Sequence, residues 1–279
     1  MSTTIISAAG KLKTLSPKEE KDFDLTQSAT ETFYNLHRLI ESKAPANNSL
    51  LGGKLGMALY YFSVYEALEK PEYAEKCVAL LEEVLQQMDT TAPEIFGNAF
   101  SAGGAGLGYV ITELHNAGLI EIDLQDELEM LDRFLFDSAM EQIIKYDAVD
   151  FLHGAMGVLH YFTQRLPGLG TTGFCSPAIE NYVQKIIDAI CGKAVEEPEG
   201  IWFRNYVTAE KDKQEINLSL SHGLSGLLVL LIQAQEKIAV NPFLQHTVME
   251  GINFMLAQQA EVDFLKNKLS FFPFHDKQC

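Results

Sequence analysis

The sequence has few positive charges and no long apolar run. Its 21 lysine and arginine residues are outnumbered by 38 aspartate and glutamate residues, and the formal net charge is −17. A chain this acidic offers no field for binding phosphate groups, so we do not expect it to bind nucleic acid. The longest apolar stretch, near residues 224–232, is about half of the ~20 residues that cross a bilayer, and the N-terminus lacks the pattern of a signal peptide. These absences predict a cytoplasmic protein without a transmembrane segment.

Cysteines and strand signals are also scarce. The four cysteines, Cys77, Cys175, Cys191 and Cys279, have no C-x-x-C spacing, which argues against a disulfide framework and a compact zinc knuckle. No run of alternating apolar and polar residues predicts a strand. Since 47% of the residues are hydrophobic, the chain can still build a large core, and we expect that core to be helical.

A repeat is the strongest pattern that is present. Four segments contain Gly-x-x-Gly followed by an apolar run: GGKLGMALYYF (52–62), AGGAGLGYVI (102–111), HGAMGVLHYF (153–162) and HGLSGLLVLLI (222–232). Their first glycines are spaced by 50, 51 and 69 residues, which indicates a repeated supersecondary unit. The longer third interval contains a polar stretch, 194–217, which we interpret as an insertion: a surface excursion, a lid or a peptide-docking loop.

Two kinds of helix alternate along the chain. The segments 28–43, 71–89, 123–144 and 241–265 have one apolar and one polar face, whereas the helices after each Gly-x-x-Gly are apolar nearly all round. A helix that is apolar on every side must be surrounded by protein. The pattern therefore predicts an all-α fold, an α/α toroid in which outer helices enclose inner ones. We expect a single domain over 1–279, with residues 1–27 poorly ordered or peripheral.

In such a toroid all inner helices begin at the same end, so the residues ahead of the first glycines should surround one pocket. Those residues are Gly52, Ala102, His153 and His222. Of these, the two histidines carry chemistry, and Gly154 and Gly223 beside them would line the pocket. A histidine at a helix start can instead be structural, bonded to a neighbouring backbone group.

Three features together resemble the lanthionine synthetase C-like family. They are SLSHGLSGLL (219–228), KYDAVDFLHGAMGVLHY (145–161) and the serial Gly-x-x-Gly helices. The resemblance implies a toroid of about seven helical hairpins with a zinc ion at its centre. This chain would contain four to five of them and be incomplete at its C-terminus.

The resemblance also implies a reaction and two catalytic residues. A peptide cysteine adds to a dehydroalanine or dehydrobutyrine to form a thioether ring, and the zinc lowers the pKa of the thiol. His222 matches the acid/base histidine of the family, which protonates the resulting enolate. Asp147 matches its active-site aspartate, although an acid at this position can also simply end a helix or cap the next one. The implied partners are a dehydrated precursor peptide and a dehydratase.

The chain departs from the family where the zinc ligands are expected. A cysteine in Trp-Cys-Tyr-Gly and an adjacent Cys-His pair have no counterpart here, since Trp202 is followed by Phe-Arg and no Cys-His dipeptide occurs. We therefore expect the metal ligands to lie beyond Cys279 and this chain by itself to bind no zinc and to be inactive. Two alternatives remain open: a non-catalytic toroid that binds peptides or proteins, and an unrelated carbohydrate-active toroid with Asp147 and Asp150 as its paired carboxylates.

Overall fold

The structure is a computed structural model of the chain. It describes residues 25–88, 95, 97–167, 176–204, 216–239 and 241–263, and the single residues 265, 270 and 272. Of residues 1–27, which we expected to be poorly ordered or peripheral, the structure describes only 25–27, the beginning of a helix. The predicted role of residues 1–24 lies outside the described residues.

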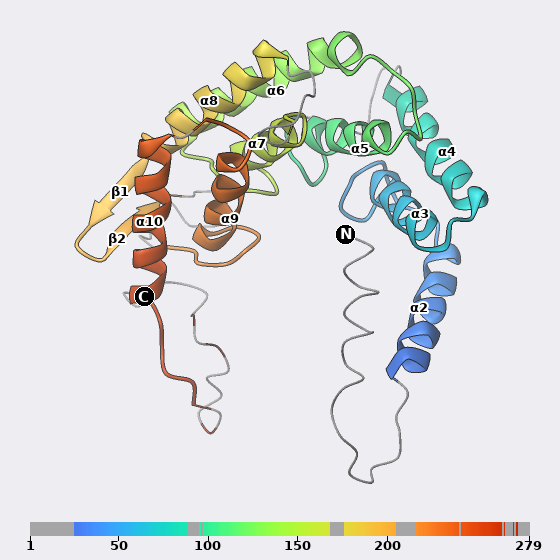
Figure 1. Cartoon of the computed structure of the whole chain (residues 1–279), viewed down its shortest axis with the longest axis horizontal. Helices are drawn as coiled ribbons and strands as arrows, with labels where there is room; N and C mark the ends of the chain where they lie inside the picture. The colour runs from blue at the N-terminus through green and yellow to red at the C-terminus, as the bar shows by residue number, and fades with distance from the viewer. Residues whose placement is uncertain are drawn as a thin grey trace.

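The helices form two layers that follow one arc (Figure 1). Helices of the inner layer contact one another in sequence order, and so do α6, α8 and α10 of the outer layer. The inner helices are α3 (Lys54–Leu68), α5 (Gly104–Asn116), α7 (Ala155–Gln164) and α9 (Leu224–Gln235). The outer helices are α4 (Pro71–Met88), α6 (Leu124–Tyr146), α8 (Pro177–Cys191) and α10 (Pro242–Ala257), and α2 (Leu25–Glu41) precedes them at one end of the arc. The predicted all-α, two-layer architecture is confirmed.

The apolar pattern of the inner helices explains their place. Helix α7 buries eight of its ten residues, among them Met156, Leu159 and Phe162, because it is enclosed by α5, α6, α8 and α9. The outer helix α4 buries one stripe, formed by Tyr73, Cys77, Leu81 and Val84. None of the helices in the described ranges is both long and apolar enough to cross a membrane.

The same turn precedes each inner helix. The residue after the first glycine donates its backbone N–H to the carbonyl of the residue seven positions earlier. The second glycine packs against the carbonyl of the residue six positions before it. A Cβ on Gly226, for example, would overlap the carbonyl of Leu220. The four N–H to carbonyl bonds join Lys54 to Asn47, Gly104 to Gly97, Ala155 to Ala148 and Leu224 to Asn217, at 2.8–3.1 Å. The Gly-x-x-Gly repeat is therefore a structural requirement of this turn.

Backbone hydrogen bonds link neighbouring turns into a row. The N–H of Leu51 donates to the carbonyl of Ser101 at 2.9 Å, and the N–H of Ser101 donates to the carbonyl of Leu152 at 3.0 Å. The starts of α3, α5 and α7 are thereby held side by side along the arc (Figure 1). Residues at equivalent positions of these turns come close together.

A β-hairpin interrupts the helical pattern, in a stretch for which the sequence predicted no strand. Strands β1 (Ala194–Glu197) and β2 (Gly200–Phe203) pair antiparallel, with Val195 opposite Trp202. Every residue of β2 is buried, and the strand packs on α10. Gly200 has φ +133°, and a Cβ there would overlap the carbonyl of Glu250. Strand β2 is therefore part of the core, while residues 205–215 lie outside the described residues.

Candidate functional site

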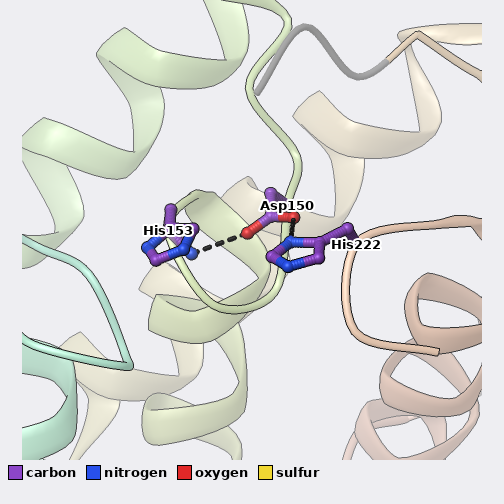
Figure 2. Close-up of side chains that lie close together, drawn as sticks. All are labelled: Asp150, His153 and His222. Carbon is purple, nitrogen blue, oxygen red and sulfur yellow. Dashed lines mark hydrogen bonds and ion pairs between the residues drawn. The ribbon is translucent and has the colours of Figure 1, made fainter. Parts of the chain in front are cut away.

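Three side chains meet where α7 and α9 begin: Asp150, His153 and His222 (Figure 2). His153 directly precedes Gly154, the N-cap of α7, and His222 precedes Gly223, the N-cap of α9. Their imidazole rings stack with 5.7 Å between centroids and 17° between planes. The structure thus brings together the two histidines that the repeat predicted to share a pocket.

Asp150 connects the two histidines. Its Oδ1 accepts the backbone N–H of His153 at 2.7 Å, and its Oδ2 lies 2.6 Å from Nδ1 of His222. The first contact is a local turn, because an aspartate readily accepts the N–H of a residue two or three positions later. The side chain of Asp150 has no exposed surface, whereas 26% of the His222 side chain is exposed. A buried carboxylate paired with a partly exposed imidazole is an arrangement suited to proton transfer.

His153 is exposed, and hydrogen bonds to Ser101 and Gln142 fix its position. Its Nδ1 lies 3.1 Å from Oγ of Ser101, which belongs to the turn before α5. Its carbonyl accepts a hydrogen bond from Nε2 of Gln142 at 3.3 Å. Gln142 is in turn bonded to Asn98, at 2.7 and 3.1 Å. The turn before α5 and helix α6 therefore both contribute to the position of His153.

The backbone and the ring of His222 have different partners. Its backbone N–H does bond to Oγ of Ser219, at 3.4 Å, but its ring faces the carboxylate of Asp150. Gly223 lines a small pocket next to the pair, together with Asp150 and Phe203. The N-termini of α7 and α9 add partial positive charge, which favours an anion at this position.

Asp147, the aspartate that the resemblance selected, lies elsewhere. It is the C-cap of α6, with φ +49°, and forms an ion pair of 2.7 Å with Lys193. Lys193 also donates to the carbonyl of Ile144. The carboxylate in contact with His222 is that of Asp150, three residues further along the chain. Position within the turn was the available signal: Asp150 and Ser219 both lie four residues before the first glycine and both accept the N–H of the following histidine.

The geometry of the three side chains differs from that of a zinc site. Their residue types bind metals, and within the described residues their donor atoms all lie within 4.8 Å of one another. Ligands of one tetrahedral zinc lie about 3.3 Å apart, yet Asp150 and His222 are at the hydrogen-bonding distance of 2.6 Å. A metal also lies in the plane of each imidazole that binds it, and the two stacked planes are nearly parallel. In this arrangement the three side chains form a hydrogen-bonded cluster that does not fit zinc.

The two cysteines that the structure describes are unsuited to metal binding. Cys77 and Cys191 are at most 2% exposed, and burial raises the pKa of each thiol to about 11. They therefore stay protonated, whereas a metal ligand must be a thiolate. Cys175 and Cys279 lie outside the described residues.

His160 lies two helical turns along α7 from His153 and belongs to the core. Its ring packs against Phe100, Tyr109 and Phe151. Burial lowers its pKa to about 4, so it is neutral at neutral pH and serves as a packed aromatic group.

Comparisons with known proteins agree with this geometry at the level of the fold. A family model described as "Lanthionine synthetase C-like protein" matches residues 44–266. Among solved structures, "Nisin cyclase" superimposes with a TM-score of 0.62 and 16% sequence identity, over 90% of this chain and 61% of that chain. This chain thus spans less than two thirds of that protein's length. No curated protein sequence matches it.

Proposed function

Because the chain belongs to the lanthionine synthetase C-like family, we propose that it acts on peptides as a thioether-forming cyclase. The proposed reaction adds the thiol of a peptide cysteine to a dehydroalanine or dehydrobutyrine of the same peptide. The substrate is then a dehydrated precursor peptide, and a dehydratase that prepares it would be a natural partner in the cytoplasm.

The contact between Asp150 and His222 is the observation that carries this proposal. A carboxylate can only accept, so Nδ1 of His222 carries a proton and Nε2 is the basic nitrogen. Nε2 takes the proton of the cysteine thiol as the sulfur attacks Cβ of the dehydroamino acid. The buried Asp150 compensates the charge of the imidazolium, which then returns the proton to Cα. One S–C bond forms, the C=C double bond is consumed, and no electrons are gained or lost.

The surroundings of the pair favour the same chemistry. Both the attacking thiolate and the enolate that follows are anions, and the N-termini of α7 and α9 face this position with partial positive charge. Zinc would supply a lowered thiol pKa in the complete family mechanism. Since Asp150, His153 and His222 do not fit zinc in this arrangement, we assign them no metal-dependent step.

The experiment is a cyclisation assay on the full chain. A peptide with one cysteine and one dehydroalanine is incubated with the wild type, with His222→Gln or with buffer, and the remaining thiol is alkylated and counted by mass spectrometry. As a matched control we choose His246→Gln, on the exposed face of α10. The sequence alone led us to expect an inactive chain, but the Asp150–His222 pair is complete within it. We therefore expect the wild type and His246→Gln to accelerate thioether formation over buffer, and His222→Gln to lose 10²- to 10⁴-fold of this acceleration, an order of magnitude typical of a lost general acid–base group. A wild type that binds the peptide but does not exceed buffer would overturn the proposal and support a non-catalytic peptide-binding toroid.

A further inference from the structure

The two stacked histidines hold their Nδ1 atoms against different partners. His222 faces the carboxylate of Asp150 at 2.6 Å, and His153 faces the hydroxyl of Ser101 at 3.1 Å. A carboxylate accepts only, whereas a hydroxyl can donate or accept. The partner of each ring therefore influences which of its nitrogens carries the proton.

Burial of Ser101 decides the direction of its hydrogen bond. The residue is only 4% exposed, and a buried hydroxyl needs an acceptor. Within the described residues, that acceptor is Nδ1 of His153. A serine that donates to Nδ1 leaves the proton of the neutral ring on Nε2, which is also the preferred tautomer of free histidine. His222 and His153 then present opposite groups: a basic Nε2 on one ring and an Nε2–H donor on the other.

We propose that His153 is a second catalytic residue, a neutral Nε2–H donor to the carbonyl oxygen of the dehydroamino acid. This role rests on the proposed cyclase function. As the sulfur bonds to Cβ, the π electrons of the C=C bond move toward the carbonyl and create an enolate oxygen. The Nε2–H of His153 stabilises that oxygen by a hydrogen bond and keeps its own proton. The thiol proton travels separately, from sulfur to Nε2 of His222 and then to Cα.

The placement of the two rings is consistent with hydrogen-bond donation by His153 and proton transfer by His222. They are nearly parallel and come from equivalent positions of adjacent turns (Figure 2). His153 is the exposed member of the cluster, so a substrate can reach it. The titratable groups in contact with it are Asp150, through the backbone N–H, and His222, through ring stacking. A neutral donor beside a basic imidazole avoids two positive charges at one site.

Nitrogen NMR tests the tautomers directly and does not require turnover. In the full chain labelled with ¹⁵N-histidine, long-range proton–nitrogen spectra distinguish a protonated from a bare ring nitrogen, and the signals lost in His153→Gln assign that ring. We expect protonated Nε2 in His153 and protonated Nδ1 in His222. Ser101→Ala should change the tautomer population of His153 and leave that of His222 unchanged. Protonated Nδ1 in His153 of the wild type would overturn the proposal.

The cyclisation assay then tests the role. We expect His153→Ala to lower kcat by 10²- to 10³-fold, the order of magnitude for removal of one oxyanion donor. His153→Gln, whose amide can still donate, should recover part of this loss. His153→Ala leaves the buried hydroxyl of Ser101 without its acceptor, so we expect it to melt at a lower temperature than the wild type, and both variants are assayed at a temperature at which thermal melting shows them folded. An active wild type with an equally active His153→Ala would overturn this role alone. An inactive wild type would overturn the proposed function, and this role with it.

Discussion

Nδ1 of His222 and Oδ2 of Asp150 lie 2.6 Å apart although 72 residues separate them in the chain. The two residues belong to different repeats, because Asp150 lies in the turn before α7 and His222 in the turn before α9. The packing of these two inner helices against each other creates the pair. The chemistry of the site thus depends on the repeat architecture, and changes in the turns should affect both stability and activity.

The second glycine of each repeat should tolerate no side chain. In Gly226→Ala the new Cβ would overlap the carbonyl of Leu220, a backbone atom that cannot move without opening the turn that carries His222. We expect a loss of 1–3 kcal/mol or more in the free energy of unfolding, the order of magnitude for overpacking, measured by urea denaturation.

Gly192→Ala is the matched control for that substitution. The nearest atom to a Cβ at Gly192 is the carbonyl oxygen of Asp188, at 3.2 Å, and the residue ends α8 rather than starting an inner helix. We expect a change below about 1 kcal/mol. Equal stability of Gly226→Ala and wild type would contradict our account of the repeat.

Gln142 should stabilise the loop that carries His153. It exchanges two hydrogen bonds with the buried Asn98 and donates to the carbonyl of His153. Gln142→Ala leaves these groups without that partner, so we expect a loss of 1–3 kcal/mol in the free energy of unfolding. Gln184→Ala, which loses only a solvent-exposed bond to Asp188, should cost less than about 0.5 kcal/mol. Similar losses in both variants would argue against a bracing role for Gln142.

His160 should make the protein sensitive to acid. Burial lowers its pKa from 6.5 to about 4, so between these two pH values the unfolded chain binds a proton that the folded chain does not. Stability is therefore complete above pH 6.5 and falls as the pH drops toward 4, by roughly 3 kcal/mol for a shift of this size. His160→Phe, which suits the surrounding aromatic rings, should show a shallower decline. Unfolding free energies measured across this range check the prediction, and identical slopes for the two proteins would contradict it.

Arg165 should stabilise the folded protein by compensating the buried negative charge of Asp132. The two side chains form an ion pair of 2.6 Å and are 5% and 6% exposed, and Tyr161 donates to the same carboxyl. Arg165→Met leaves the charge of Asp132 uncompensated, and we expect a loss of 3–5 kcal/mol at pH 7.

The pH dependence of that variant gives a second check. Burial raises the pKa of Asp132 above 3.8, and the charge of Arg165 works against this rise. Without Arg165 the pKa rises further, so the folded state binds more protons and regains stability as the pH falls toward 3.8. We expect Arg165→Met to be closer to the wild type at pH 4 than at pH 7. A loss independent of pH would point to lost packing instead of an uncompensated charge.

The two helix layers and the proximity of His153 and His222 could be predicted from the sequence, because both follow from local rules. An inner helix must be apolar all round, and a turn that needs two glycines keeps its spacing in every copy. The hairpin was missed because Ile201, Trp202 and Phe203 form a run too short to show alternation, and its burial is decided by contact with α10. The position of Asp147 outside the cluster could not be predicted for a similar reason: the direction of a carboxylate depends on where α6 ends, and Asp147 is the C-cap there.

The central claim is that Asp150 is the catalytic partner of His222, and a comparison of Asp150→Asn with Asp147→Asn tests it most directly. Asp150→Asn keeps the shape of the side chain but removes the charge that supports the imidazolium of His222, and Asp147→Asn removes only the ion pair with Lys193. In the cyclisation assay, with folding checked by thermal melting, we expect Asp150→Asn to lose 10²- to 10⁴-fold of the acceleration and Asp147→Asn to stay within about threefold of the wild type, as for loss of a partly exposed ion pair. A large loss in Asp147→Asn together with an active Asp150→Asn would contradict the assignment of Asp150 as the partner of His222.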